Sequence, residues 1–294
     1  MGLEWGVVAA ASSSAIGGTA IGATRYLVGA LSALAIGACR FGIGALLLLA
    51  LGVMRRTPWP PRRDVPAAIA LGLLLFAVFP LLFNSALRFT TASRGALALA
   101  TMPLLTMVLG AALGAEAFTR RRFAGVCLAI AGVAFALLWD PAAAPRGAWR
   151  GDVIMLAAAF CMALYNVLSK PLFQRSSALG VTVVAMGAGA SCLLLLATVH
   201  GDLAPLRHLG ARRWAALLYL GVFGGALAFQ LWALGLRRST PTQVATTVTL
   251  NPVSAACVGH ALLGEPLPWA TWIGVAAIAA GIVLAAGGSR VPMR

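Results

Sequence analysis

Five polar side chains recur with helical spacing in the apolar segment 241–263. At i, i+3, i+4, i+8 and i+11 they share one face of a helix, and they are Gln243, Thr246, Thr247, Asn251 and Ser254. A polar stripe on an apolar helix has to face protein or water. Five such groups exceed what contacts between helices usually need, so the pattern favours a cavity wall, with helix packing as the alternative. The chemistry that these groups offer is neutral hydrogen bonding to a small solute.

Aromatic and neutral polar residues of other apolar segments extend this candidate site. The further binding candidates are Ser13, Phe79, Phe83, Asn84, Thr101, Tyr165, Asn166, Gln230 and Trp232. Aromatic faces beside amide and hydroxyl groups suit an amphiphilic solute whose apolar part is buried, and zwitterionic amino acids fit that description. Strongly anionic solutes would need clustered cations. Arg40 is the one cation at mid-membrane depth, and we interpret it as a structural residue bonded to carbonyls or facing a vestibule.

The acidic residues all stand at the ends of apolar segments. They are Glu4, Asp64, Glu116, Asp140, Asp152, Asp202 and Glu265. A carboxylate at mid-membrane depth is the usual ion relay of a coupled transporter, so this placement favours uncoupled transport. Glu116 and Glu265 are predicted to stabilise helix ends, and His260 to be a packing residue. The sequence has no HExxH, GxSxG or CxxC motif, so we expect no catalytic residues, no metal site and no cofactor.

Composition places these residues in a membrane. Hydrophobic residues make up 61% of the 294 and charged residues 10%, against about 25% charged in an average globular chain; the mean hydropathy is +0.94. A bilayer core of about 30 Å takes about 20 apolar residues per helix. Ten segments fit, namely 5–24, 31–53, 66–87, 91–114, 121–139, 151–169, 178–199, 212–236, 241–263 and 268–287. We therefore predict an all-α integral membrane protein with ten transmembrane helices.

The net charge of +15 is interpreted as a topology signal, and nucleic-acid binding is not expected. Basic residues between apolar segments favour the cytoplasmic side of a membrane. With the N-terminus inside, thirteen of the 22 basic residues fall on the inside and eight on the outside. We expect a multi-pass protein of the inner (plasma) membrane with both termini cytoplasmic. Residues 1–5 lack the basic region of a cleaved signal peptide, so the first segment is expected to be retained.

The sequence resembles itself at an offset of 149 residues. Residues 71–136 align with 220–285 without a gap, and the matches include Arg88/Arg237, Pro103/Pro252, Glu116/Glu265 and Gly132/Gly281. Five crossings in each copy, an odd number, give the two copies inverted topology, as in many secondary transporters. We expect one membrane domain over 1–294, with repeat one at 1–140, repeat two at 147–288 and a linker at 140–150, packed around a central cavity.

Residues that interrupt helices at matching positions point to a site between such repeats. The candidates for kinks or gating are Gly17, Gly18, Pro80, Pro103, Gly224, Gly225 and Pro252. Pro103 and Pro252 each stand about halfway along a segment, where proline removes a backbone hydrogen bond, and we interpret both as gating kinks. For the glycines, close packing is favoured over gating, and both alternatives stay open.

Several short motifs carry a family resemblance over nearly the whole chain. They are Ala38-Cys-Arg40-Phe41, Thr90-Thr-Ala-Ser93 leading to Pro103, Leu113-Gly-Ala-Glu116, Gly125 to Gly132, Ala163-Leu-Tyr-Asn166, Asn251-Pro252, Leu263-Gly-Glu265 and Trp272-Ile-Gly274 to Gly281. In this order they resemble the drug/metabolite transporter superfamily, specifically its ten-helix EamA-type members. The resemblance implies an exporter of amino acids and other small metabolites, with cytoplasmic termini and a cavity lined mainly by helices 1, 3, 4, 6, 8 and 9. The chain looks most like the exporters of amino acids and aromatic metabolites.

Together, the residues and the resemblance predict export of hydrophobic, aromatic and other neutral amino acids and related metabolites by uncoupled alternating access. A proton-coupled efflux antiporter for drugs or cations is the alternative; a lipid flippase or a membrane-embedded enzyme is more distant. The expected partners are a small-molecule substrate and membrane lipid, and the expected state is a monomer or weak homodimer.

Overall fold

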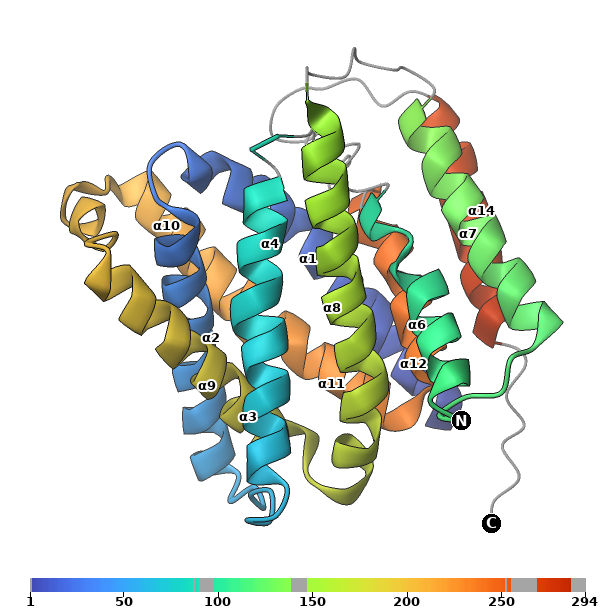
Figure 1. Cartoon of the computed structure of the whole chain (residues 1–294), viewed down its shortest axis with the longest axis horizontal. Helices are drawn as coiled ribbons and strands as arrows, with labels where there is room; N and C mark the ends of the chain where they lie inside the picture. The colour runs from blue at the N-terminus through green and yellow to red at the C-terminus, as the bar shows by residue number, and fades with distance from the viewer. Residues whose placement is uncertain are drawn as a thin grey trace.

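The computed structural model describes residues 2–86, 88–89, 98–138, 147–251, 253–254 and 269–286, which form a bundle of helices with no strand among them (Figure 1). Six helical stretches are long and apolar enough to cross a membrane: Trp5–Val28, Ala33–Met54, Val65–Ala86, Trp149–Arg175, Ala178–Val199 and Ala211–Arg238. Met102–Ala112 and Trp272–Leu284 are shorter apolar helices. The prediction of an all-helical membrane protein is confirmed for the described residues. The number of ten crossings stays a prediction.

The first half of the described chain holds six α-helices and one π-helix. These are α1 (Gly2–Val28), α2 (Ala33–Met54), α3 (Val65–Leu73), the π-helix η1 (Leu74–Val78), α4 (Phe79–Ala86), α6 (Met102–Ala112) and α7 (Arg120–Leu138). Helices α3, η1 and α4 follow one another without a break, so they form one composite helix. Its length of 22 residues corresponds to about 33 Å at 1.5 Å per residue, enough for one crossing.

The second half begins with two long helices and a second composite one. Its elements are α8 (Ala148–Arg175), α9 (Ala178–Val199), the 3-10 helix η2 (Ala204–His208), α10 (Ala211–Tyr219), the π-helix η3 (Leu220–Leu227), α11 (Ala228–Arg238), α12 (Pro241–Thr246), the 3-10 helix η4 (Thr247–Leu250) and α14 (Trp269–Ala286). Helix α8 is longer than the predicted segment 151–169 and includes Lys170, whereas α9 has the predicted bounds 178–199. The longer α8 brings a lysine into a helix that crosses the membrane.

Polar residues directly before several helices explain where these begin. The Ser32 and Ser177 hydroxyls accept hydrogen bonds from the backbone N–H groups of Ala35 and Gly180, at the starts of α2 and α9. Thr240 and Gln243 form a capping box at the start of α12. Each cap supplies an acceptor to backbone N–H groups that have no partner in the first helical turn.

The helices pack so that distant parts of the chain alternate across the bundle. Helix α2 packs against α9 and η3, α1 against α11, α4 and α6 against α8, and α7 against α14 at one edge (Figure 1). Helix α1 is thus surrounded largely by helices of the second half. These contacts show that the two halves form one bundle.

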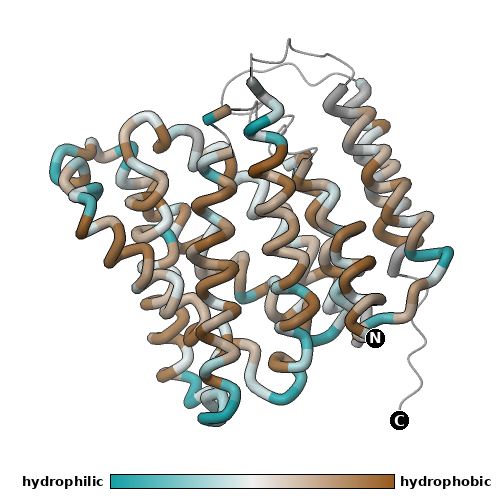
Figure 2. The backbone as a smooth tube through the Cα atoms, viewed as in Figure 1, coloured by the Kyte–Doolittle hydropathy of each residue, from teal (hydrophilic) through white to brown (hydrophobic). Residues whose placement is uncertain are grey.

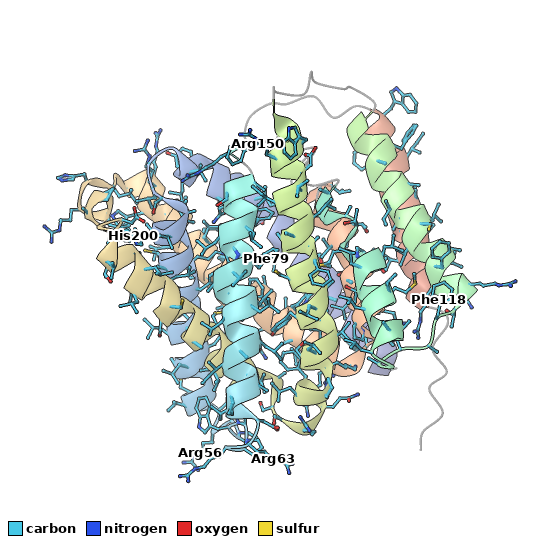
Figure 3. The ribbon with its side chains drawn as sticks, in the orientation of Figure 1. Arg56, Arg63, Phe79, Phe118, Arg150 and His200 are labelled. Atoms are coloured by element: carbon cyan, nitrogen blue, oxygen red, sulfur yellow. The ribbon has the colours of Figure 1, made fainter. Side chains whose placement is uncertain are left out.

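The bundle has an apolar middle and two polar ends, as Figure 2 shows. Figure 3 labels Arg56 and Arg63 at one end, called the lower end below, and Arg150 at the other, called the upper end. Between the ends, many large apolar side chains point outward; Leu46, Leu195 and Val283 are 68%, 64% and 69% exposed. An outer belt of this kind is expected where lipid replaces water as the solvent.

Candidate binding cavity

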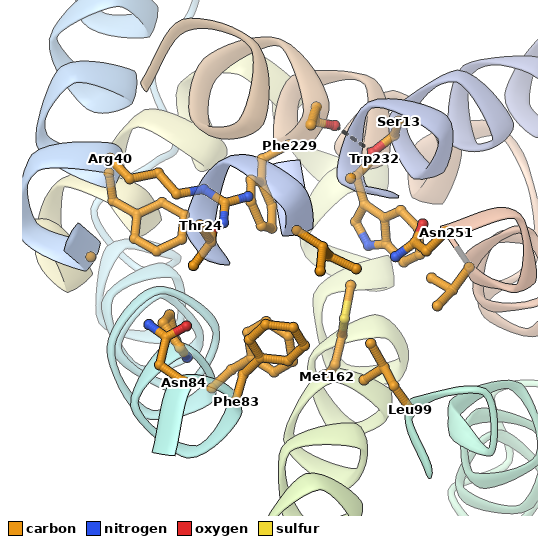
Figure 4. A pocket seen from close by; sticks show the side chains of 18 of the residues that line it. Ser13, Thr24, Arg40, Phe83, Asn84, Leu99, Met162, Phe229, Trp232 and Asn251 are labelled. Carbon is orange, nitrogen blue, oxygen red and sulfur yellow. Dashed lines mark hydrogen bonds between the residues drawn. The ribbon is translucent and has the colours of Figure 1, made fainter. Parts of the chain in front are cut away.

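A cavity of about 100 Å³ lies between helices of both halves of the chain (Figure 4). Its walls are Ser13, Ser14, Gly17, Ile21 and Thr24 of α1; Ile36, Gly37, Arg40 and Phe41 of α2; Phe79, Pro80, Phe83 and Asn84 of α4; and Leu99, Met162, Ala228, Phe229, Trp232, Val248 and Asn251. The walls combine aromatic rings, neutral polar groups and one cation. Such a surface can hold a small amphiphilic solute.

A π-helix precedes the α4 wall of the cavity. In η1 the hydrogen-bonding ladder widens over Leu74–Val78, and Pro80, which has no backbone N–H, lies just after it. One wide turn changes the direction of the side chains that follow, and such turns are frequent at functional sites. Phe79 and Phe83 then point into the cavity (Figure 4), with ring centroids 5.8 Å apart.

The second π-helix brings a backbone carbonyl against the cavity arginine. Gly224 lies in η3, and its carbonyl accepts a hydrogen bond from Arg40 Nη2 at 2.8 Å. A Cβ at Gly224 would stand 3.3 Å from Nη2 and 3.4 Å from Nε, while one at Gly225 would stand 2.7 Å from the Arg40 carbonyl oxygen. Both glycines therefore allow η3 to approach α2 closely, and a role in gating stays a prediction.

Hydroxyl groups of α1 connect the cavity wall to the second half. Ser13 Oγ donates to the Ala228 carbonyl at 2.7 Å, and the Ser14 hydroxyl shares a 2.9 Å hydrogen bond with the Thr247 hydroxyl. Nearer the upper end, the Thr19 and Tyr219 hydroxyls are 2.5 Å apart. These bonds hold α1 against α10, α11 and η4.

Six of the predicted binding residues line the cavity, and a seventh holds one of them from behind. The six are Ser13, Phe79, Phe83, Asn84, Trp232 and Asn251. Asn166 is fully buried and accepts a hydrogen bond of 3.0 Å from Trp232 Nε1. It therefore orients the indole from outside the cavity.

The remaining predicted binding residues do not line the cavity, and most of their polar groups bond to nearby backbone. Tyr165 packs edge-on against Phe76 and Phe173. The hydroxyls of Thr101, Thr246 and Thr247 donate to the carbonyls of Ala98, Thr242 and Val244, respectively. Gln243 completes the capping box of α12. Gln230 Oε1 is buried without a hydrogen-bond partner among the described residues. Of the five-residue stripe that suggested a cavity wall, only Asn251 reaches the cavity. Ser254 donates to carbonyls of its own helix.

The predicted interruptions also differ in their surroundings. Gly17 and Pro80 line the cavity. A Cβ at Gly18 would stand 2.3 Å from the Asn251 carbonyl oxygen, so this glycine allows α1 to approach the end of η4. Pro103 lies in the first turn of α6, where the missing N–H leaves no helical bond unmade. Pro252 lies outside the described residues.

Polar contacts join the segments at the lower end, and one of them connects the two halves. Glu116, between α6 and α7, accepts hydrogen bonds from the backbone N–H of Thr242 at 2.8 Å and from Arg122 at 2.9 Å. Lys170 donates to the carbonyls of Leu236 at 2.7 Å and Ser239 at 2.5 Å. Glu116 was predicted to stabilise a helix end, and the end that it contacts is the start of α12, in the other half of the chain.

Burial governs the protonation of this carboxyl group. Desolvation raises the pKa of Glu116, while the Thr242 N–H and the Arg122 charge act in the opposite direction.

A second ion pair lies at the same end, where Arg175 Nη2 stands 3.3 Å from a carboxylate oxygen of Asp64. Side chains of the helix segments near these contacts are packed: Phe173, Leu236 and Val244 are each fully buried.

Several lining residues lay outside the sequence prediction. On α1, Ser14, Ile21 and Thr24 share the face of Ser13 and Gly17, a spacing that could have revealed them. Phe41, Phe229 and Met162 are common membrane residues with no distinguishing pattern. Arg40 was interpreted as bonded to carbonyls or facing a vestibule and not as a binding residue; it donates to the Gly224 carbonyl and also lines the cavity. Among the described residues no three His, Cys, Asp or Glu side chains gather as metal ligands would.

Comparison with known families gives a match over nearly the whole chain. The model of the EamA-like transporter family matches residues 4–138 and again residues 149–287. A solved crystal structure superposes with a TM-score of 0.78 and 22% sequence identity, covering 97% of this chain and 98% of that one. This likeness concerns the fold alone.

Two curated relatives have names that state a substrate class. The "Probable terminal-alkyne amino-acid exporter" of Streptantibioticus cattleyicolor is 31% identical over 229 residues, which are 76% of this chain and 74% of that protein. The "Probable amino-acid metabolite efflux pump" of Salmonella typhimurium is 31% identical over 241 residues, 78% of this chain and 80% of that protein. An uncharacterized transporter of Bacillus subtilis is 24% identical over 233 residues.

Proposed function

Since the chain belongs to the EamA-like transporter family and is a multi-pass membrane transporter of the drug/metabolite type, we propose that it exports neutral amino acids, above all hydrophobic and aromatic ones, and related small metabolites. The observation that carries this proposal is the composition of the cavity. Phe79, Phe83 and Phe229 offer an apolar surface, while Asn84 and Asn251 offer neutral hydrogen-bonding groups. The names of two relatives support the same class of substrate.

The proposed mechanism is alternating access between two inverted five-helix repeats. Its support is the position of the irregular turns. The π-helix at 74–78 corresponds, at the 149-residue offset, to residues 223–227 within η3. The 3-10 turn of η4, at 247–250, corresponds to residues 98–101, directly before α6. Helices with weakened ladders at matching positions can bend around a shared site.

The proposal assigns the lower end to the cytoplasm, with both termini there and the inner membrane around the bundle. The clustered arginines at 55–63 and 120–122 support this orientation. In the structure described here the lower end is packed and the cavity lies above it, as in a transporter whose cytoplasmic side is closed. Transport is proposed to be uncoupled, because the seven acidic residues of the sequence stand at the ends of its apolar segments.

Counterflow in liposomes tests the function. Liposomes that contain the purified protein are loaded with an unlabelled amino acid. Their uptake of labelled L-phenylalanine, L-leucine, L-alanine and a cationic drug is compared with the uptake by liposomes without protein. We expect uptake of the amino acids at equal pH on both sides. Uptake of the cationic drug alone would overturn the proposed substrate. Accumulation above equilibrium when a pH gradient is imposed would overturn the uncoupled mechanism and support a proton-coupled antiporter.

A further inference from the structure

Arg40 places a positive charge in the cavity wall, inside the membrane-spanning part of the bundle. It lies seven residues after the start of α2, which is about 10 Å along the helix axis. In Figure 4 its guanidinium group reaches toward the cavity from the α2 side. A charge at such depth is costly, and when it faces a cavity it commonly serves the solute.

The guanidinium group is only partly satisfied by the protein. Of its N–H groups, one on Nη2 donates to the Gly224 carbonyl at 2.8 Å. Nε is buried and has no hydrogen-bond partner among the described residues. Nη1 makes no hydrogen bond to a described residue either, and it is not a buried atom. Because Arg40 lines the cavity, a solute there can reach it. A partly buried cation with unpaired donors is an incomplete arrangement that an anion would complete.

No acidic side chain among the described residues balances this charge. Glu116 pairs with Arg122 and Asp64 with Arg175, both at the lower end. The contacts of Arg40 are instead with aromatic rings, since its Cζ stands 5.2 Å from the ring centroid of Phe41 and 6.0 Å from that of Phe229. Rings hold the guanidinium plane in place and stabilise it weakly, but they leave its edge donors free.

We propose that Arg40 binds the carboxylate of the transported solute, which makes it the group that selects carboxylate-bearing substrates. The proposal rests on the proposed function and adds the chemical feature that the cavity recognises. An Arg fork matches the two oxygens of a carboxylate, and such charge-assisted bonds are about twice as strong as neutral ones. One cation matches one carboxylate, so a monocarboxylate is favoured over a doubly charged phosphate ester.

The other walls of the cavity fit the remainder of such a solute. The apolar side chain would lie against Phe79, Phe83 and Phe229. An ammonium group needs acceptors, and Asn251 Oδ1 is buried without a partner among the described residues, on a wall of the same cavity. A zwitterion would therefore pair both unpartnered groups at once, whereas an amine without a carboxylate would add a second positive charge beside Arg40.

A ligand series on the unmodified protein tests the proposal without depending on the folding of a variant. Purified protein binds labelled L-phenylalanine, and competition by 3-phenylpropionate, L-phenylalaninamide and 2-phenylethylamine is measured. The first competitor keeps the carboxylate and loses the ammonium group; the other two lose the carboxylate. We expect L-phenylalaninamide and 2-phenylethylamine to compete about 10- to 100-fold less well than unlabelled L-phenylalanine, and 3-phenylpropionate to compete better than either.

Substitution then assigns the preference to Arg40. Arg40→Gln should weaken binding of L-phenylalanine and 3-phenylpropionate by about 10- to 100-fold while binding of L-phenylalaninamide changes little, and Arg40→Lys should restore part of the loss. The matched control is Arg212→Gln, an exposed arginine at the start of α10, outside the cavity. It should bind the series as the unmodified protein does.

Each outcome separates this proposal from the proposed function. Binding and counterflow of L-phenylalanine with no preference for carboxylate over amide would overturn the role of Arg40 and leave amino-acid export standing. Equal losses for all four ligands in Arg40→Gln would likewise overturn it, because a purely structural role predicts them. If the unmodified protein neither binds nor exchanges any amino acid, the proposed function itself is overturned, and this inference with it.

Discussion

The lower end and the cavity of this bundle contain similar polar residues in opposite circumstances. At the lower end, Glu116 and Lys170 make hydrogen bonds to backbone groups of α12 and of the end of α11. In the cavity, Arg40 Nε and Asn251 Oδ1 are buried with no hydrogen-bond partner among the described residues. Because an unmade buried hydrogen bond is expensive, paired groups indicate where the protein contacts itself. Unpaired groups that line a cavity, as these two do, can bind a ligand there; Ser169 Oγ and Gln230 Oε1 are also unpaired but lie away from the cavity.

This difference predicts different consequences for substitutions of similar size. Removing a paired group at the lower end should lower the free energy of unfolding and loosen the closure. Removing an unpaired group in the cavity should weaken ligand binding and leave the free energy of unfolding unchanged. The four predictions below follow in order of expected effect.

Glu116→Ala should have the largest effect. It removes the acceptor of the Thr242 N–H and of Arg122 Nη1, and loss of one partner of a buried ion pair costs roughly 3–5 kcal/mol. We expect a lower thermal midpoint and faster labelling by maleimide of a cysteine placed at Ser169, which is 1% exposed above this contact. Glu116→Gln keeps an acceptor and serves as the control. Equal behaviour of the two variants and the unmodified protein would show that the contact does not close this end.

Lys170→Gln should come next. The substitution removes the ammonium group that donates to the carbonyls of Leu236 and Ser239, at the end of α11. Hydrogen bonds from a charged donor contribute about 1.5–3 kcal/mol, and a cation is favoured at the C-terminal end of a helix. Hydrogen exchange in the last turn of α11 should become faster, with Lys170→Arg close to the unmodified protein. Unchanged exchange in Lys170→Gln would contradict this account.

Asn251→Ala should weaken ligand binding without lowering stability. Its Oδ1 has no partner among the described residues, so the fold loses no hydrogen bond, whereas a bound ammonium group loses one worth about 1 kcal/mol, or about 5-fold in Kd. Competition binding with L-phenylalanine and the thermal midpoint are the two measurements. A lower thermal midpoint with unchanged affinity for L-phenylalanine would show that Asn251 stabilises the fold and does not bind the ligand. Ser254→Ala, whose hydroxyl bonds its own helix, is the control.

Acidification should give the smallest effect. The pKa of Glu116 is raised by burial in the closed end, and if this end opens, water restores the usual carboxyl value of about 4.3. The closed state then binds the proton more tightly, so lowering the pH from above the raised pKa toward the usual one favours closure. Labelling at position 169, expressed relative to that of an exposed cysteine at the same pH so that the thiolate fraction cancels, should slow over that window. Arg122 and Lys170 face the same carboxyl group, and Glu116→Gln should abolish the dependence.

The sequence predicted parts of the candidate site and missed others for a definite physical reason. Ser13 and Asn251 were found because polar groups in apolar helices require a partner. The same rule selected Thr246 and Thr247, whose hydroxyls bond carbonyls three or four residues earlier. Helical spacing alone does not distinguish a hydroxyl that bonds its own helix from one that faces a cavity. The binding roles of all these residues stay predictions.

The sequence by itself determined that this chain is an all-helical membrane protein of the EamA-like family. Apolar length, caps such as Ser32 and the doubled family pattern are local properties of the chain. Only the tertiary structure decided that Glu116 contacts the start of α12 and that Arg40 lies in a cavity wall with donors unpaired. These facts depend on which helices from the two halves lie side by side. Packing between helices that are far apart in the sequence sets that arrangement, and no local pattern specifies it.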